Sequence, residues 1–256
     1  MILANHLIKA KGRTSPFNFG EVIFIHGLGS SALMWEKAAE FLASKGLTCH
    51  RLEFRGHGSS AEEYQETPLE LHVNDLKETL ARLNMTKPYV FIGHSLGAIV
   101  SLELACQDNS DIAGILAVGM PVKVPKITCW GFELFLNTIY PSLKVTKLYK
   151  LLPWREKTLI QTNEYSLRQI LKNIKDINFF THSKYADFAQ IKLPIHFACG
   201  NIDPVAILKD SKEFQKLFPD SSLKVFKIGG HNFMDYKEVE FNTWIFDKLS
   251  TISQNL

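Results

Sequence analysis

The sequence predicts an α/β protein with a mostly parallel central sheet and helices on both faces. Its 256 residues, of which 46% are hydrophobic and 21% charged, suit one unit with a sizeable core. Short apolar runs alternate with helical segments, and these runs lie at residues 21–25, 47–54, 89–92, 112–119, 194–200 and 223–228. Strands that are apolar on both faces and separated by helices are typical of βαβ units.

Apolar residues at helical spacing lie between the expected strands. The first helix follows Ser30 or Ser31, either of which can cap its N-terminus, and Gly46 ends it. The other helices of the sheet region are expected over residues 68–83 and 98–106, around 214–217 and over 239–249. In such an arrangement the loops after the carboxyl ends of the strands converge on the functional site.

Composition and charge exclude several classes of protein. The net charge of +3 is too small for a nucleic-acid binder, and we find no glycine-rich phosphate or dinucleotide loop. Cys49, Cys106, Cys129 and Cys199 lie tens of residues apart, which argues against a zinc site and favours reduced thiols. Because we find neither a signal peptide nor an apolar run of about 20 residues, we expect a cytoplasmic protein with no transmembrane segment. The lack of a cluster of metal ligands and of a cofactor-binding motif predicts no metal and no cofactor.

The strongest motif is Gly93-His94-Ser95-Leu96-Gly97, between an expected strand and an expected helix. This context is typical of a nucleophile elbow, a sharp turn that holds the serine in a strained backbone conformation with its hydroxyl exposed. Glycines on both sides remove the Cβ atoms that would collide with neighbouring backbone. The alternative is a glycine-rich turn that happens to contain a serine.

A serine hydroxyl needs a base and an orienting acid to become a nucleophile. Asp203, in Gly-Asn-Ile-Asp-Pro, and His231, in Gly-Gly-His-Asn-Phe, each follow one of the last two expected strands. Alone, an aspartate before proline suits a turn and a histidine is usually structural. Together, in the order Ser, Asp, His, they indicate a catalytic triad. Asp235, four residues after His231, better fits the start of a helix.

The residues His26-Gly27-Leu28-Gly29 follow the first buried strand. Glycines there let the backbone approach a ligand closely. We therefore expect the backbone N–H groups of Leu28 and Leu96 to form the oxyanion hole. The alternative is an ordinary strand-to-loop turn.

These motifs give the chain a full-length resemblance to the α/β-hydrolase superfamily, in particular to its serine hydrolases with a single cap, such as carboxylesterases and lipases. The matching segments are His26–Gly29, Arg55-Gly56-His57-Gly58-Ser59, residues 93–97, residues 200–204 and Gly230-His231. Glu53 stands where many relatives have Asp, and we expect an effect on loop packing only. The resemblance implies that His57 belongs to the scaffold beside the site. Relatives with an aspartate nucleophile are mostly dehalogenases and epoxide hydrolases, so the serine at this position argues against both activities.

The resemblance also implies a helical cap, inserted before the strand that carries the aspartate. We expect a hydrolase core at residues 1–120 and 187–256, and we call residues 121–186 the cap segment. This segment holds ten of the 29 aromatic residues, which suggests an apolar pocket as much as an ordinary buried underside. Pocket residues are expected to include His26, Gly27, His94, Trp130 and Phe135.

Positive charge is concentrated in the cap segment, which contains eleven Lys and Arg residues but only four Asp and Glu residues. The local excess is +7, and the rest of the chain carries −4. Lys144, Lys147, Lys150, Arg155 and Lys157 alternate with leucines. Such a surface suits an anionic membrane, an anionic substrate or an acidic carrier protein. The pimeloyl carrier-protein methyl esterases, which are similar in fold, hold an acidic carrier with a basic cap. A solvated lysine-rich face is the simpler explanation.

The function that we expect is hydrolysis of small-molecule carboxylic esters with an apolar acyl group, through an acyl-enzyme on Ser95. Alternatives with the same machinery are hydrolysis of a carbon–carbon bond in a diketone, thioester cleavage and acyl transfer. An alternative of another class is a receptor-like protein that binds its ligand and turns it over slowly.

Overall fold

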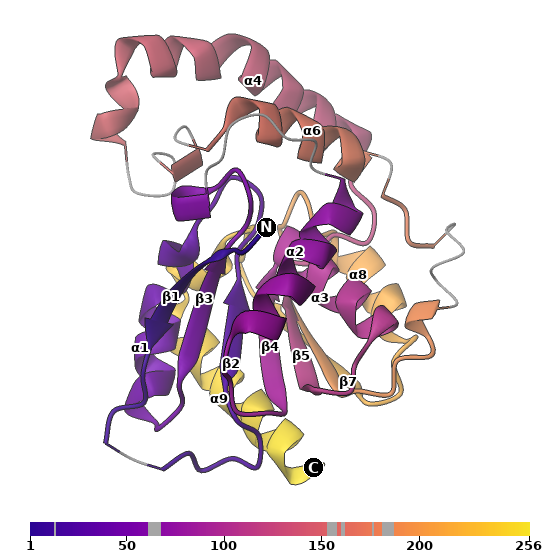
Figure 1. Cartoon of the computed structure of the whole chain (residues 1–256). Coiled ribbons are helices and arrows are strands. Elements are labelled where there is room, and N and C mark those ends of the chain that lie inside the picture. Colours follow the sequence, from indigo (N-terminus) through magenta and orange to yellow (C-terminus); the bar gives the residue numbers. More distant parts are fainter. Residues whose placement is uncertain (13, 61–67, 153–157, 160–161, 176, 181–186) are drawn as a thin grey trace.

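A seven-stranded sheet forms the centre of the molecule in our computed structural model, which describes residues 1–12, 14–60, 68–152, 158–159, 162–175, 177–180 and 187–256 (Figure 1). The sheet order is β1-β3-β2-β4-β5-β6-β7. Its strands are β1 (Ala4–Ile8), β2 (Val22–Ile25), β3 (Cys49–Glu53), β4 (Tyr89–His94), β5 (Ile112–Val118), β6 (Ile195–Gly200) and β7 (Ser221–Phe226). Only the pair of β1 and β3 is antiparallel among these seven strands, so the expected mostly parallel sheet is confirmed.

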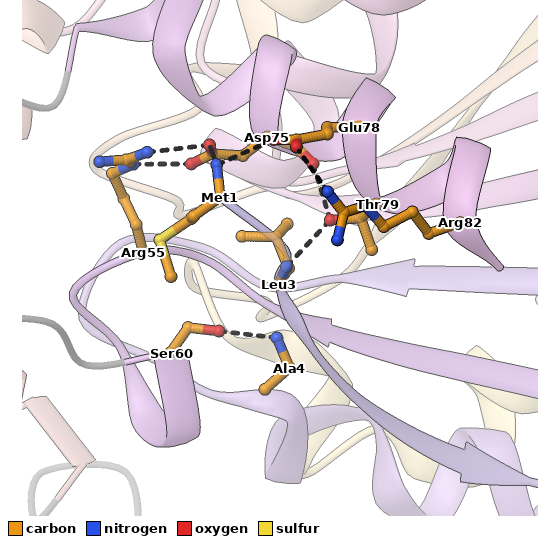
Figure 2. Close-up of polar contacts among 9 residues, drawn as sticks. All are labelled: Met1, Leu3, Ala4, Arg55, Ser60, Asp75, Glu78, Thr79 and Arg82. Atoms are coloured by element: carbon orange, nitrogen blue, oxygen red, sulfur yellow. Dashed lines mark hydrogen bonds and ion pairs between the residues drawn. The ribbon is translucent and has the colours of Figure 1, made fainter.

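Strand β1 is an edge strand that the sequence did not predict. Its residues Asn5 and His6 interrupt the apolar pattern, and the strand is held largely by its partners. The N–H of Leu3 donates to Thr79 Oγ1 at 2.9 Å, and the N–H of Ala4 donates to Ser60 Oγ at 2.8 Å (Figure 2). These contacts tie the start of β1 to the helix and the loop beside it.

Helices cover both faces of the sheet, as expected (Figure 1). One face packs against α1 (Glu36–Ser44) and α9 (Glu238–Gln254), through buried residues such as Leu42 and Trp244. The other face packs against α2 (Leu69–Arg82), α3 (Leu96–Gln107) and α8 (Leu208–Gln215). Single turns of 3₁₀ helix, namely η1 (Ala32–Trp35), η2 (Gly58–Ser60) and η4 (Phe233–Asp235), lie in the loops.

The cap segment lies between β5 and β6 in the chain and above one end of the sheet in Figure 1. It contains α4 (Lys126–Thr146), η3 (Leu148–Leu151) and α6 (Glu164–Lys175). Leu136 and Tyr140 of α4 pack on Leu167 and Leu171 of α6 in a separate apolar cluster. The side of α6 that faces the sheet joins the main core, so α6 lies between α4 and the rest of the molecule.

Two features expected from the sequence can be placed on this fold. No disulfide joins the four cysteines, all of which lie in described ranges, and burial raises the pKa of the Cys199 thiol to about 11. In the described parts of the chain, we find no helix with the length and hydrophobicity that a membrane crossing requires. Trp154, Arg155 and Lys157 lie outside the described residues, as does Tyr185.

Candidate active site

Ser95 occupies the turn between the end of β4 and the first residue of α3. Its backbone has φ 52° and ψ −113°, a conformation that a residue with a Cβ adopts only under strain. The turn is held because the Ser95 N–H donates to the Val118 carbonyl at 2.9 Å. A Cβ at Gly93 would meet backbone atoms of residues 97 and 98 at 2.6 Å, and one at Gly97 would meet the Ile25 carbonyl. The flanking glycines are therefore required sterically.

Asp203 and His231 form a direct contact between the ends of β6 and β7. His231 Nδ1 donates to Asp203 Oδ2 at 2.8 Å. The other carboxylate oxygen accepts the N–H groups of Val205 and Ala206 at 2.8 and 2.9 Å. Because Asp203 holds the proton of His231 on Nδ1, the neutral imidazole presents Nε2 as a base.

The aspartate of this pair is deeply buried, whereas the histidine is accessible. The Asp203 side chain is 0% exposed, and that of His231 is 19% exposed. The buried carboxylate is stabilised by its two backbone donors and can in turn stabilise a positive charge on the imidazole. Asp235, the other acid considered for this role, lies in η4.

Ser95 and His231 line the same cavity, which has a volume of about 350 Å³. The cavity is also lined by His94, by Asn232 and by the loop from Gly27 to Ser30, all from the sheet region. The cap segment supplies most of the apolar lining, and these residues are Val124, Cys129, Phe132, Leu159, Leu171 and Ile174. The cavity therefore combines an apolar lining with the Ser95 and His231 side chains.

The loop that was expected to form the oxyanion hole passes close to Ser95. A Cβ on Gly27 would lie 3.1 Å from Ser95 Cβ and 2.8 Å from His94 Nδ1, so only glycine fits. Leu28 follows at the cavity wall. Leu96 is the first residue of α3, and its N–H is one of the donors that a helix cannot satisfy internally. Both backbone segments thus lie next to the serine.

Two buried histidines hold this loop through hydrogen bonds to its backbone. His57 Nδ1 donates to the Arg55 carbonyl at 2.9 Å, and its Nε2 accepts the Gly29 N–H at 3.0 Å. His26 Nδ1 donates to the Gly27 carbonyl at 2.7 Å, and its Nε2 accepts the Phe54 N–H at 3.0 Å. Burial lowers the pKa of His26 to about 4 and that of His57 to about 3. Both rings are therefore neutral at pH 7.

The loop after β3 is anchored by charged groups. The Arg55 guanidinium forms two hydrogen bonds with the Asp75 carboxylate, at 2.6 and 2.8 Å (Figure 2). Glu53 accepts the N–H groups of Ala32 and Ser59 at 3.1 and 2.6 Å. Burial favours the neutral form of Glu53, but its contacts with the Ser59 N–H, the His6 side chain and the Ala32 N–H outweigh burial and leave its pKa lowered. Glu53 thus holds neighbouring loops, which agrees with its expected role in loop packing.

The structure changes the expected pocket at three residues. His26 is fully buried in the scaffold, so it supports Gly27 and does not line the cavity. Trp130 is 62% exposed and does not line the cavity, although its neighbour Cys129 does. Phe135 packs between Phe132 and Tyr140 within the cap segment. Gly27 and His94 do line the cavity, and the aromatic side chain in its wall is Phe132.

His94 adds a contact that links the elbow to the base. Its Nε2 donates to the carbonyl oxygen of His231 at 3.0 Å. The sequence placed His94 beside the nucleophile, but the link to His231 depends on tertiary structure. Over the described residues, no group of three or more His, Cys, Asp and Glu side chains could hold a metal ion.

Two proteins with assigned names are similar to this chain in sequence. The chain is 23% identical over 252 residues to a protein of Escherichia coli O139:H28 named as a carbamate hydrolase, RutD, covering 90% of this chain and 91% of that protein. It is 29% identical over 136 residues to a monoglyceride lipase homologue of Monkeypox virus, covering 50% and 49% of the two chains.

A solved esterase from Exiguobacterium antarcticum has the same fold, with a TM-score of 0.80 at 14% identity, over 97% of this chain and 95% of that one. The model of the family described as serine aminopeptidase, S33, matches residues 18–238. The expected α/β-hydrolase resemblance is therefore confirmed, and the chain belongs to the serine aminopeptidase S33 (Hydrolase_4) family.

Proposed function

We propose that this protein is a serine hydrolase that cleaves carboxylic esters with an apolar acyl group. One observation carries the proposal: the hydrogen-bonded pair of Asp203 and His231 opens into the same cavity as a strained Ser95. This combination supplies a nucleophile, a base in the right tautomer and a buried acid. The family match supports hydrolysis as the reaction class.

In the proposed reaction, Ser95 Oγ attacks the ester carbonyl while His231 Nε2 removes the hydroxyl proton. The tetrahedral intermediate collapses when the imidazolium returns that proton to the leaving alcohol, and an acyl-enzyme remains. Water then attacks the acyl group with the same base, which releases the acid and restores Ser95. Asp203 keeps Nε2 unprotonated in the resting enzyme and stabilises the imidazolium.

Charge on the carbonyl oxygen is proposed to be stabilised by the N–H groups of Leu28 and Leu96. The second lies at the positive end of the α3 dipole, where an anion is favoured. His57 is proposed to position the first, because its Nε2 anchors the N–H of the adjacent residue Gly29. His57 is therefore a positioning residue and not the base.

The cap segment is proposed to select the acyl group. Six of its side chains form an apolar wall over Ser95, and the volume of about 350 Å³ lies at the lower end for small-molecule pockets. We therefore expect short and medium acyl chains to be preferred. The relatives named as carbamate hydrolases differ in the bond that their names specify, and the apolar wall favours an ester over a small polar carbamate.

The test is hydrolysis of p-nitrophenyl esters from acetyl to palmitoyl, beside a p-nitrophenyl carbamate, by the wild type and by Ser95→Ala. We expect ester turnover that peaks at short or medium chains and disappears in the variant. Turnover of the carbamate alone would contradict the ester proposal. Labelling by a fluorophosphonate with no ester turnover would also contradict it, and would favour carbon–carbon bond hydrolysis or a receptor.

A further inference from the structure

Helix α4 carries two apolar faces, and only one of them is used by the fold. The inner face packs on α6 and lines the cavity through residues such as Phe132, Leu136 and Tyr140. The outer face carries a second row of exposed apolar side chains, which continues past the end of the helix. Its members are Ile127, Trp130, Leu134, Val145, Leu148 and Leu151.

The outer row consists of two groups of apolar residues, because Thr138 and Ser142 lie between Leu134 and Val145 on the same side of the helix. Ile127, Leu134 and Val145 are separated by about two and about three helical turns, so they lie on one line. Their exposed fractions are 76%, 47% and 82%. A surface helix normally presents polar residues on the side away from the core. An exposed apolar row of this length is a mark of an interaction surface.

Lysines border the outer row. Lys126 and Lys144 are about five turns apart and so share one flank of the helix, and Lys147 and Lys150 follow its C-terminal end. Glu133, the single acid in the α4 sequence, is paired with Lys175 of α6. In the described ranges, no carboxylate lies within 4.0 Å of the four lysines. Lys144 Nζ, however, donates to the hydroxyl of buried Tyr140 at 3.1 Å and lies over that ring. The charge offered to a partner therefore comes from Lys126, Lys147 and Lys150.

We propose that the outer face of α4 docks on an anionic lipid bilayer. The apolar row enters the boundary between headgroups and acyl chains, and Lys126, Lys147 and Lys150 contact headgroup phosphates. Figure 1 shows α4 as the outermost element at its end of the molecule, where it can meet a plane. A second copy of the chain is a poorer occupant, because two positive faces would repel each other.

Docking is independent of the proposed hydrolysis, since it uses only the outside of α4. It also brings the cavity to the bilayer, because Thr128, Cys129 and Phe132 of the same helix line that cavity. If the proposed function holds, an acyl ester dissolved in the bilayer reaches Ser95 from the docked side.

The experiment measures co-sedimentation of the full chain, as Ser95→Ala to avoid lipid turnover, with two kinds of vesicle. One is phosphatidylcholine alone, and the other contains about a third phosphatidylglycerol. We expect binding to the anionic vesicles that exceeds binding to the neutral ones by more than tenfold. Lys126→Gln with Lys150→Gln should lower the partition coefficient about thirtyfold, because each basic residue near an anionic surface contributes about a factor of five.

Apolar variants and matched controls complete the test. Leu134→Ser with Val145→Ser should lower partition by more than tenfold, since both side chains leave the acyl boundary. Lys9→Gln with Lys11→Gln removes two exposed lysines just after β1, and Val239→Ser removes a side chain that is 81% exposed on α9. Both controls should bind as the parent does.

Several results would overturn the proposal. These are absence of binding to either vesicle, equal binding to both, and undiminished binding of the α4 variants. Self-association in sedimentation velocity that Leu134→Ser abolishes would assign the face to a second copy, and capture of an acidic carrier protein without vesicle binding would assign it to that partner. The same variants with Ser95 intact should still cleave a soluble ester, which separates failure of docking from misfolding and from failure of the proposed function.

Discussion

The sheet region and the cap segment contribute to the site in different ways. The sheet region places Ser95, Asp203 and His231 through backbone geometry: a strained turn, two N–H donors on a carboxylate and strand ends in register. The cap segment contributes apolar side chains from α4 and α6 and none of these three groups. We therefore propose that the sheet region carries the chemistry and that the cap segment selects the substrate.

The sharpest test of the sheet region's role is Ser95→Ala. We expect turnover of p-nitrophenyl butyrate to fall by at least about 10⁴-fold, because the variant lacks the hydroxyl that is proposed to take the acyl chain. Ser101→Ala is the matched control, as Ser101 lies on α3 and its hydroxyl donates to the Gly97 carbonyl. It should keep most of its turnover. Equal losses in the two variants would mean that the elbow was damaged rather than the nucleophile removed.

Asp203→Asn should have the next largest effect. The amide cannot hold the proton on His231 Nδ1 as the carboxylate does, so we expect kcat to fall by about 10⁴-fold with KM little changed. Asp235→Asn is the control, since Asp235 lies in η4 and does not orient the ring in our account. Steady-state kinetics at several pH values checks both. A stronger effect from Asp235→Asn would contradict the assignment of the acid.

Acid should destabilise the sheet region through its buried histidines. Burial lowers the pKa values of His26, His57 and His72 to about 4, 3 and 3, while an unfolded histidine has a pKa of about 6.5. Below pH 6.5 the unfolded chain therefore binds more protons, and the free energy of unfolding falls as the pH falls toward 4. The three together contribute a slope of up to about 4 kcal/mol per pH unit.

Urea unfolding followed by circular dichroism between pH 7 and pH 4.5 measures this slope. His72→Gln and His72→Leu should each reduce it by about a third, because either change removes one titrating ring. His72 lies in α2, away from the cavity lining, so ester turnover at pH 7.5 should persist in both. An unchanged slope in both variants would rule out His72 as a source of the acid sensitivity.

Substitutions in the cap segment should give the smallest effects and should depend on the substrate. Phe132→Ala opens the apolar wall, so we expect kcat/KM for a medium-chain ester to fall about tenfold while that for the acetyl ester changes little. Trp130→Ala, on the outer side of the same helix, should leave both values unchanged. An equal loss on both esters in Phe132→Ala would mean that the cap segment also supports the chemistry.

The same contrast explains what could be predicted from the sequence. The elbow, the Asp and His loops and the succession of strands and helices along the chain depend on local rules for glycine, caps and apolar runs, and each of these leaves a short motif. The cap segment has no such motif. Its aromatic content suggested a pocket, but only the packing of α4 on α6 decides that Phe132 faces inward while Trp130 faces solvent.

Some features of the sheet region were also hidden. Strand β1 is held by hydrogen bonds to Ser60 and Thr79, which periodicity cannot reveal. The supports that His26 and His57 give the loop at Gly27–Gly29 join residues 28 positions apart. The cytoplasmic location, the domain boundaries and the carrier-protein partner stay predictions from the sequence.

The most direct test of the central claim is active-site labelling with a fluorophosphonate, followed by peptide mass spectrometry. Our account predicts one adduct per chain, on Ser95, none on Ser95→Ala, and much slower labelling of Asp203→Asn. The same adduct should form on Trp130→Ala at the wild-type rate. An adduct on any other residue, or labelling that persists in Ser95→Ala, would contradict the assignment of Ser95 as the nucleophile.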